Sequence, residues 1–128
     1  MMSSTKLSHY RHQLRKLLDQ IEKLSFKCAY ADPLIQGTPG EVFRTCGKKT
    51  CKCATDNSKR HGPYLVIQIY QDKKQRQVAI RKDQKEIWQK AKNYQGQINT
   101  LSELKAVCAE LTDTVQKILL DRIEKWPS

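Results

Sequence analysis

The sequence predicts an α+β fold in which two long helices flank a small three-stranded antiparallel β module. Apolar residues recur every three or four positions near both ends of the chain, which is the period of helices that pack along their length. Between these regions apolar and polar residues alternate, which is the period of strands. We therefore divide the chain into an N-terminal heptad helix (1–32), a β module (33–83) and a C-terminal helix or pair of helices (84–128), together forming one compact domain.

The N-terminal helix is predicted from an apolar stripe that continues over three heptads. Its members follow one another at steps of three and four: Leu7, Tyr10, Leu14, Leu17, Ile21, Leu24 and Cys28. Ser4 or Thr5 can cap the start of this helix. Asp32 precedes a proline, which disfavours helical backbone and ends the helix. Residues 33–40 contain two prolines and two glycines, so we expect a loop there.

The middle of the chain predicts an antiparallel meander. Residues 64–70 form its central strand, with Leu65, Ile67 and Ile69 on one face and Tyr64, Val66, Gln68 and Tyr70 on the other. A shorter strand precedes it at 41–45, and a polar turn at 71–75 leads to a third strand around Val78 and Ile80. Because this module has few large apolar side chains, its stability requires packing against the helices or a bound metal.

The C-terminal region predicts one long helix from about 84 to 125. Two apolar stripes support it: Ile87, Ala91, Tyr94 and Ile98, and then Leu101, Leu104, Cys108, Leu111, Val115 and Ile118. Asp83 and Glu86 are spaced as a capping box at its start. The stripes differ in phase and meet near Gly96, so a helix bent at Gly96 and two separate helices both remain open. Thr100 and Glu103 could cap the second of two helices.

A cluster of cysteines precedes the central strand and predicts a metal site. Cys46, Cys51 and Cys53 lie within eight residues, and His61 follows after a polar loop. Thiolates and imidazole are preferred zinc ligands, and four of them complete a closed tetrahedral structural site. Gly47 lets the backbone turn beside the first thiolate. Cys51 and Cys53 would point to opposite faces of a strand, so Lys52 must lie in a turn if both bind the ion.

The fourth zinc ligand and the remaining cysteines leave alternatives open. His61 is the expected fourth ligand, and Cys28, His12 or His9 could replace it. Cys28 and Cys108 otherwise occupy core positions of the two helical stripes.

Three sequence blocks resemble a small uncharacterised family found in bacteria, archaea and their phages. The blocks are residues 40–44, the Cys-Gly-Lys start at Cys46 with Cys51 and Cys53, and the His-Gly-Pro-Tyr block that begins at His61. The resemblance covers about residues 38–110 and leaves the N-terminal helix outside. It implies that the four metal-binding residues act as a set. Some relatives are associated with transposable elements, which implies a function in nucleic-acid binding. The chain departs from the family pattern at Arg81 and in its hairpin turn, which lacks the usual glycine.

The net charge of +11 is concentrated in the middle of the chain and suggests a polyanionic partner. Residues 41–92 contain 14 Lys/Arg and 5 Asp/Glu, a net +9. Such a local positive field suits nucleic acid, DNA ahead of RNA, because a three-stranded sheet can enter the major groove. A solvated basic surface is the alternative. The expected contacts are Arg44, Lys48, Lys49, Lys52, Lys59, Arg60, Tyr64, Tyr70, Lys73, Lys74, Arg76 and Arg81. The two tyrosines could instead pack beneath a helix.

Two further classes of function have less support from the sequence. The heptad stripes could form a homodimer or receive a helix of another protein, with the zinc site purely structural. Enzymatic activity is not expected, because carboxylates are scattered and four ligands leave no open coordination position on the ion. Nothing in the sequence approaches a membrane span, and we expect a cytoplasmic protein with no membrane partner.

Overall fold

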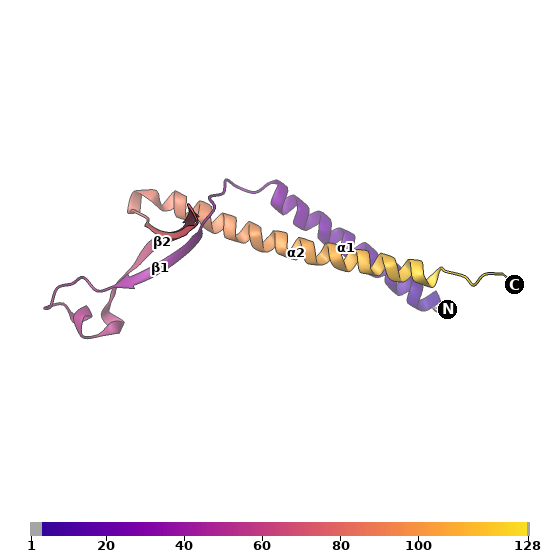
Figure 1. The fold of residues 1–128 in the computed structure, drawn as a ribbon, viewed down its shortest axis with the longest axis horizontal. Coiled ribbons are helices and arrows are strands. Elements are labelled where there is room, and N and C mark those ends of the chain that lie inside the picture. Colours follow the sequence, from indigo (N-terminus) through magenta and orange to yellow (C-terminus); the bar gives the residue numbers. More distant parts are fainter. Residues whose placement is uncertain (1–3, 128) are drawn as a thin grey trace. The chain divides into compact units, whose positions relative to one another are not determined.

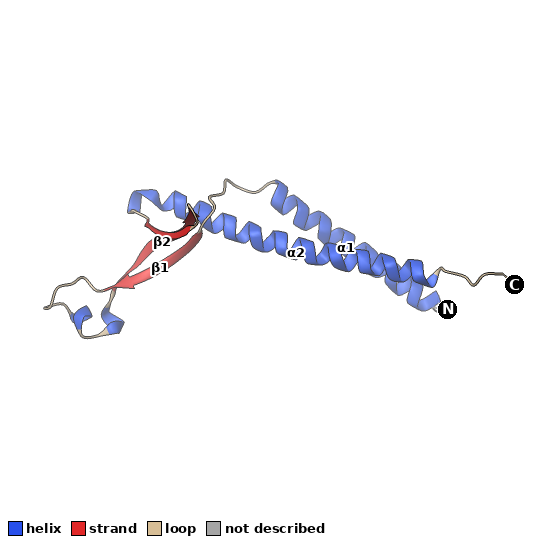
Figure 2. Cartoon of the chain, viewed as in Figure 1, coloured by secondary structure: helices blue, strands red, loops and turns tan. Residues whose placement is uncertain are grey.

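The computed structural model describes residues 4–127, which form two compact units. One unit comprises the chain up to Tyr30 together with the chain from Gln97 onward, and the other runs from Ala31 to Gly96. A helix, a strand, a connecting loop, two strands and a long helix follow in this order (Figure 1). Helices occupy both ends of the chain and the strands lie between them in sequence (Figure 2). The predicted fold class, two long helices flanking a three-stranded antiparallel sheet, is confirmed.

The helical unit pairs α1 (Ser4–Ala29) with the C-terminal part of α2 (Lys85–Asp121). The Gln13 amide donates a hydrogen bond to the Glu110 carboxylate at 3.1 Å, and the Lys117 ammonium group lies 5.8 Å from the centre of the Tyr10 ring. These contacts join early residues of one helix to late residues of the other, so the two run antiparallel. Leu7 and Leu17 are buried, and the other members of the predicted α1 stripe are half-buried.

The buried stripe of α2 differs from the predicted one by one position in each heptad. The residues that turn inward are Thr100, Leu104, Val107, Leu111, Thr114 and Ile118. The predicted Leu101, Cys108 and Val115 are exposed instead. Two neighbouring stripes of this helix could each face α1, and the one that is buried contains two threonines. Burial of Thr114 is tolerated because its hydroxyl donates to the Glu110 carbonyl at 2.9 Å.

Helix α2 is continuous through Gly96, which confirms one long helix rather than two. It ends at Asp121 rather than near 125. The predicted capping box of Asp83 and Glu86 is wrong, because a 3₁₀ turn, η3 (Lys82–Gln84), precedes the helix. The side-chain oxygen of Gln84 accepts a hydrogen bond from the Arg81 N–H at 3.1 Å. This pair caps the 3₁₀ turn that leads into α2.

The three strands β1 (Thr38–Arg44), β2 (His61–Gln71) and β3 (Lys74–Ala79) pair antiparallel in this order. The first strand begins at Thr38, three residues earlier than expected, so the loop predicted over 33–40 is too long. Pro39 fits because β1 is an edge strand, where the missing N–H of proline breaks no ladder. The pairs Thr38–Gln68 and Val66–Ala79 fix the register on either side of β2.

The hairpin between β2 and β3 is tighter than the five-residue turn that the sequence predicts. Only Asp72 and Lys73 connect the strands, and both have positive φ values, 53° and 62°. Two consecutive positive φ values are typical of a type I′ turn, whose twist matches that of the flanking strands. The turn therefore forms without the glycine that it would favour at the second position.

The core of the sheet unit lies at the middle of β2, where both faces are covered. Neighbouring Val66 and Ile67 point to opposite faces, yet both are buried. The N-terminal part of α2 packs here, with a fully buried Ala91 and with the Trp88 indole N–H donating to the Gly40 carbonyl at 3.3 Å. Helix and meander thus support each other, as the shortage of apolar residues in the meander requires.

Candidate metal centre

The pairing of β1 with β2 brings the two ends of the cysteine loop together. Arg44, the last residue of β1, pairs with His61, the first residue of β2. The intervening loop contains two single-turn 3₁₀ helices, η1 (Lys52–Ala54) and η2 (Asn57–Lys59). Lys52 therefore lies in a turn, as expected if Cys51 and Cys53 serve the same site. Asp56 accepts hydrogen bonds from the Ser58 N–H and hydroxyl, at 2.9 and 2.7 Å, and so fixes the second turn.

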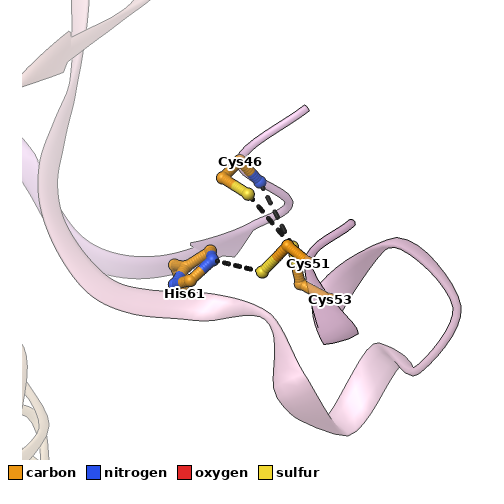
Figure 3. Close-up of side chains that lie close together, drawn as sticks. All are labelled: Cys46, Cys51, Cys53 and His61. Atoms are coloured by element: carbon orange, nitrogen blue, oxygen red, sulfur yellow. Dashed lines mark hydrogen bonds between the residues drawn. The ribbon is translucent and has the colours of Figure 1, made fainter. Parts of the chain in front are cut away.

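The four predicted ligands converge on one point. The ligand atoms of Cys46, Cys51, Cys53 and His61 all lie within 4.8 Å of one another. The Cys46 and Cys53 sulfurs are 3.5 Å apart, and the Cys51 sulfur lies 3.3 Å from His61 Nε2. Figure 3 shows the imidazole turned toward Cys51 and the Cys46 thiol turned toward Cys53. The cluster is therefore close enough to hold a metal ion.

The two shortest of these separations are close to those around a tetrahedral zinc ion. Zinc bonds of about 2.3 Å to sulfur and about 2.0 Å to nitrogen place two sulfurs about 3.8 Å apart, and sulfur and nitrogen about 3.5 Å apart. The shortest observed separations differ from these values by a few tenths of an ångström. Three thiols and an imidazole also form a soft donor set, which binds zinc more readily than it binds harder cations. The geometry and the chemistry of the cluster both fit this ion.

Hydrogen bonding and burial affect the thiols of the cluster unequally. The Cys53 N–H, followed by the Cys53 and Cys46 thiols, lowers the pKa of Cys51 by hydrogen bonding. At Cys53 the Cys46 N–H, 3.4 Å from the sulfur, also lowers the pKa. Burial of Cys53, which is 1% exposed, and the neighbouring thiols outweigh that effect and raise its pKa. A cation at the centre would supply the charge that stabilises all three as thiolates.

Two glycines shape the backbone around the cluster. Gly47 has a φ of 80°, a left-handed conformation that other residues rarely adopt, which confirms its predicted turn. Gly62 has a φ of 144°, and a Cβ there would lie 2.7 Å from the Val42 carbonyl oxygen. Only glycine therefore lets β2 approach β1 directly after His61. The glycine of the His-Gly-Pro-Tyr block thus helps to position His61 at the cluster.

The alternative ligands and the other cysteines lie elsewhere. His9, His12 and Cys28 are on α1, outside the cluster. Cys28 is half-buried, as its stripe position predicts. Cys108 is exposed, so its predicted core position is wrong, because the inner stripe of α2 passes through Val107 instead.

All twelve residues predicted to contact nucleic acid are exposed, and most lie in two groups at opposite ends of β2. The first group surrounds the cysteine cluster: Arg44, Lys48, Lys49, Lys52, Lys59 and Arg60. The second lies at the β2–β3 hairpin: Tyr70, Lys73, Lys74 and Arg76. Tyr64 and Arg81 belong to neither group. With a rise of about 3.3 Å per residue, the nine steps from His61 to Tyr70 separate the groups by about 30 Å.

Tyr64 and Tyr70 are 48% and 72% exposed, so neither is buried beneath a helix. A third aromatic side chain, Phe43, is 54% exposed on β1 next to the cluster and was not predicted as a site residue. Period-two alternation could have identified it, because the half-buried Val42 beside it must point to the other face.

The chain belongs to the family described as Domain of unknown function (DUF6788), whose profile matches residues 8–89. The matched region includes most of α1, whereas the resemblance noted from the sequence left this helix outside. The description of the family does not mention phages or transposable elements. No curated protein and no solved structure matches the chain significantly. Within residues 4–127, no helix combines the length and hydropathy that a membrane-spanning segment requires.

Proposed function

We propose that this protein binds nucleic acid, with DNA preferred over RNA, through a basic module held together by one structural zinc ion. The observation that carries the proposal is the position of the cysteine cluster inside the most basic part of the chain. Lys48 and Lys49 lie between two ligands, and Lys52 lies between the next two. Zinc would hold the backbone of all three lysines, which reduces the conformational entropy lost when they contact phosphates.

The charge distribution supports phosphate binding over catalysis. The exposed cations around the cluster have no acidic side chain within the cysteine loop except Asp56, which is engaged by Ser58. Phosphate contacts by lysine and arginine release counterions and supply most of the affinity of non-specific binding. Four protein ligands fill the coordination of a tetrahedral ion, so the proposed zinc has a structural role and no substrate position.

The experiment is a salt titration of duplex DNA binding by the zinc-loaded protein. Changing Lys48, Lys49 and Lys52 together to alanine should weaken binding and reduce the salt slope by roughly 2 to 3, because each lost phosphate contact removes about 0.9. The matched control changes Lys105, Arg122 and Lys125, which are exposed in the near-neutral C-terminal segment. Lys117 is not used, because it pairs with Asp113 at 3.1 Å.

The outcomes of this titration separate three cases. A selective loss in the first variant supports a defined binding face. Equal losses in both variants would mean that only net charge matters, which contradicts that face. Absence of binding to duplex or single strands at low salt would overturn the proposal. A role in a mobile element, phage or defence system is a further part of the proposal, and neighbouring genes would test it.

A second candidate function is self-association through α2, and the exposed stripe on this helix favours it. Leu101, Cys108 and Val115 are separated by steps of seven, so the stripe is nearly symmetric about Cys108. Two antiparallel copies related by a two-fold axis near Cys108 would place Leu101 of each beside Val115 of the other. The stripe would then lie in a four-helix arrangement. In this alternative the zinc site only stabilises the fold.

A further inference from the structure

A small pocket lies on the sheet unit at the end of β2 that is remote from the cysteine cluster. Its volume is about 280 Å³. Three neighbouring segments line it: Gln36, Gly37 and Thr38 where the chain enters β1, Gln68, Ile69 and Tyr70 from β2, and Tyr94 from α2. We propose that this pocket receives one unpaired nucleobase of a bound single strand, an inference that rests on the proposed nucleic-acid function.

The lining has the chemistry of a base site. It contains two phenol rings and two carboxamides but no charged side chain, so it suits a neutral, planar, polar-edged group better than a phosphate or a metal ion. Among residues 4–127, neither the Gln36 nor the Gln68 carboxamide has a hydrogen-bond partner. Each therefore offers a donor and an acceptor to the edge of a base.

Tyr70 provides the surface on which a base could stack. Its ring is 72% exposed although it lines the pocket, so one face is available to a ligand. Tyr94 is half-buried and fixed on α2, where it forms part of the wall. The volume lies slightly below the range of about 300–1,000 Å³ that is usual for drug-sized ligands. A single base is a ligand of the size that such a pocket can hold.

At Gly37, beside the pocket, the backbone lies so close to β2 that only glycine fits. A Cβ on Gly37 would lie 2.5 Å from the Ile67 Cγ2 atom and 3.5 Å from the Ile69 Cγ2 atom. The chain can therefore lie against the sheet only because Gly37 has no side chain. This contact gives the pocket a firm wall, since Ile67 is 2% exposed and cannot move aside.

Three cations lie on the β2–β3 hairpin, at the same end of β2 as the pocket: Lys73 in the turn, and Lys74 and Arg76 on β3. Lys74 and Arg76 pair with Gln71 and Ile69, so their side chains share the face of Ile69 and not that of Tyr70. A strand whose base enters the pocket could therefore contact these cations only with the phosphates that run along the Ile69 face. Because extrusion of a base from a duplex costs unstacking and unpairing energy, the pocket favours unpaired strands or mismatches.

The test uses the full zinc-loaded chain and a short single-stranded DNA that carries the fluorescent base 2-aminopurine. Tyr70→Ala should lower the affinity for the single strand about tenfold and abolish the fluorescence quenching that stacking causes. The salt slope should stay unchanged, because no phosphate contact is removed. Gln68→Ala should weaken binding less, and Tyr70→Phe should retain both affinity and quenching, since the ring is kept.

The matched control is Tyr30→Ala, which removes a tyrosine that is 80% exposed and lies outside both the pocket and the expected nucleic-acid contacts. Wild-type affinity and quenching in Tyr70→Ala, or equal losses in Tyr30→Ala, would overturn the pocket assignment while steep salt dependence still supported the proposed function. If the wild-type protein binds neither single strands nor duplex at low salt, both proposals fail. Circular dichroism and zinc content of each variant verify that its fold is intact.

Discussion

The Nε2 atom of His61 lies 3.3 Å from the Sγ atom of Cys51, although the two residues come from different elements. His61 begins β2, whereas Cys51 precedes the first 3₁₀ turn of the loop. The contact depends on the pairing of Arg44 with His61, which returns the chain to the place where it left the sheet. A metal at this point would link the loop to the strand pair, so sheet and cluster should be lost together.

The first prediction is therefore that removal of the metal selectively disorders the unit at 31–96. The protein should contain one zinc per chain, and Cys51→Ser should abolish it, since three ligands hold zinc far more weakly than four. Hydrogen exchange should then become fast in β1 and β2 while α1 stays protected, because α1 lies in the other unit.

The control for this prediction is Cys108→Ser, which removes an exposed thiol outside the cluster. It should leave zinc content and hydrogen exchange unchanged. A protein without bound metal after gentle purification, with β1 and β2 still protected, would contradict a structural zinc site.

The second prediction concerns packing in the helical unit. Leu17→Ala should reduce the free energy of unfolding by about 2–5 kcal/mol, because this side chain is 3% exposed and its removal leaves a cavity. Leu18→Ala is the matched control, since Leu18 has the same chemistry on the same helix but is 50% exposed. Denaturant titration of both variants would test the pairing of α1 with α2, and equal effects would argue against it.

The contrast between α1 and α2 shows how far periodicity can predict packing. The stripe of α1 is the only continuous apolar line on that helix, so its inner face was predictable. On α2, Leu104, Leu111 and Ile118 belong to both lines, and the choice between Val107 and Cys108 depends on α1. Sequence alone therefore identified the helix but not its rotation, because rotation is a tertiary property.

Within the sheet, the missed features are those that depend on pairing rather than on local preference. Pro39 and Gly40 favour a loop by composition, but β1 forms because β2 supplies its hydrogen-bond partners. The cluster of three cysteines and His61 was predictable because its chemistry and short spacing are local. The pocket beside Tyr70 was not, since Gln36 and Tyr94 come from distant segments.

The third prediction uses Gly96 within α2. A Cβ at this position would meet no atom within 4 Å, so Gly96→Ala adds a methyl group without a clash. Alanine restricts the unfolded chain and favours the helix interior, so the free energy of unfolding should rise by about 0.5–1 kcal/mol. Thermal denaturation would measure this gain. A destabilised variant would mean that the helix requires the flexibility of glycine here.

The fourth prediction concerns the hairpin turn. Lys73 has a φ of 62°, which is unfavourable for any residue with a Cβ. Lys73→Gly should therefore stabilise the protein by about 1 kcal/mol, because Asp-Gly is a favoured pair in type I′ turns. Lys73→Ala removes the same charge but keeps the Cβ, so it should give no such gain. If both variants behave alike in thermal denaturation, the effect comes from charge and not from the backbone.

The last prediction tests self-association through the exposed stripe of α2. Leu101 and Val115 are 39% and 37% exposed, and burial of each would remove apolar surface from water at about 25 cal/mol per Å². If two copies pair about Cys108, Val115→Glu would place two carboxylates in the apolar interface, one from each copy. Sedimentation velocity should then show a concentration-dependent dimer for the wild type and a monomer for the variant. Ala106→Glu is the control, because it adds the same charge at an exposed position outside the stripe and should leave the dimer intact. A wild-type protein that stays monomeric at high micromolar concentration would exclude self-association and leave nucleic-acid binding as the function to pursue.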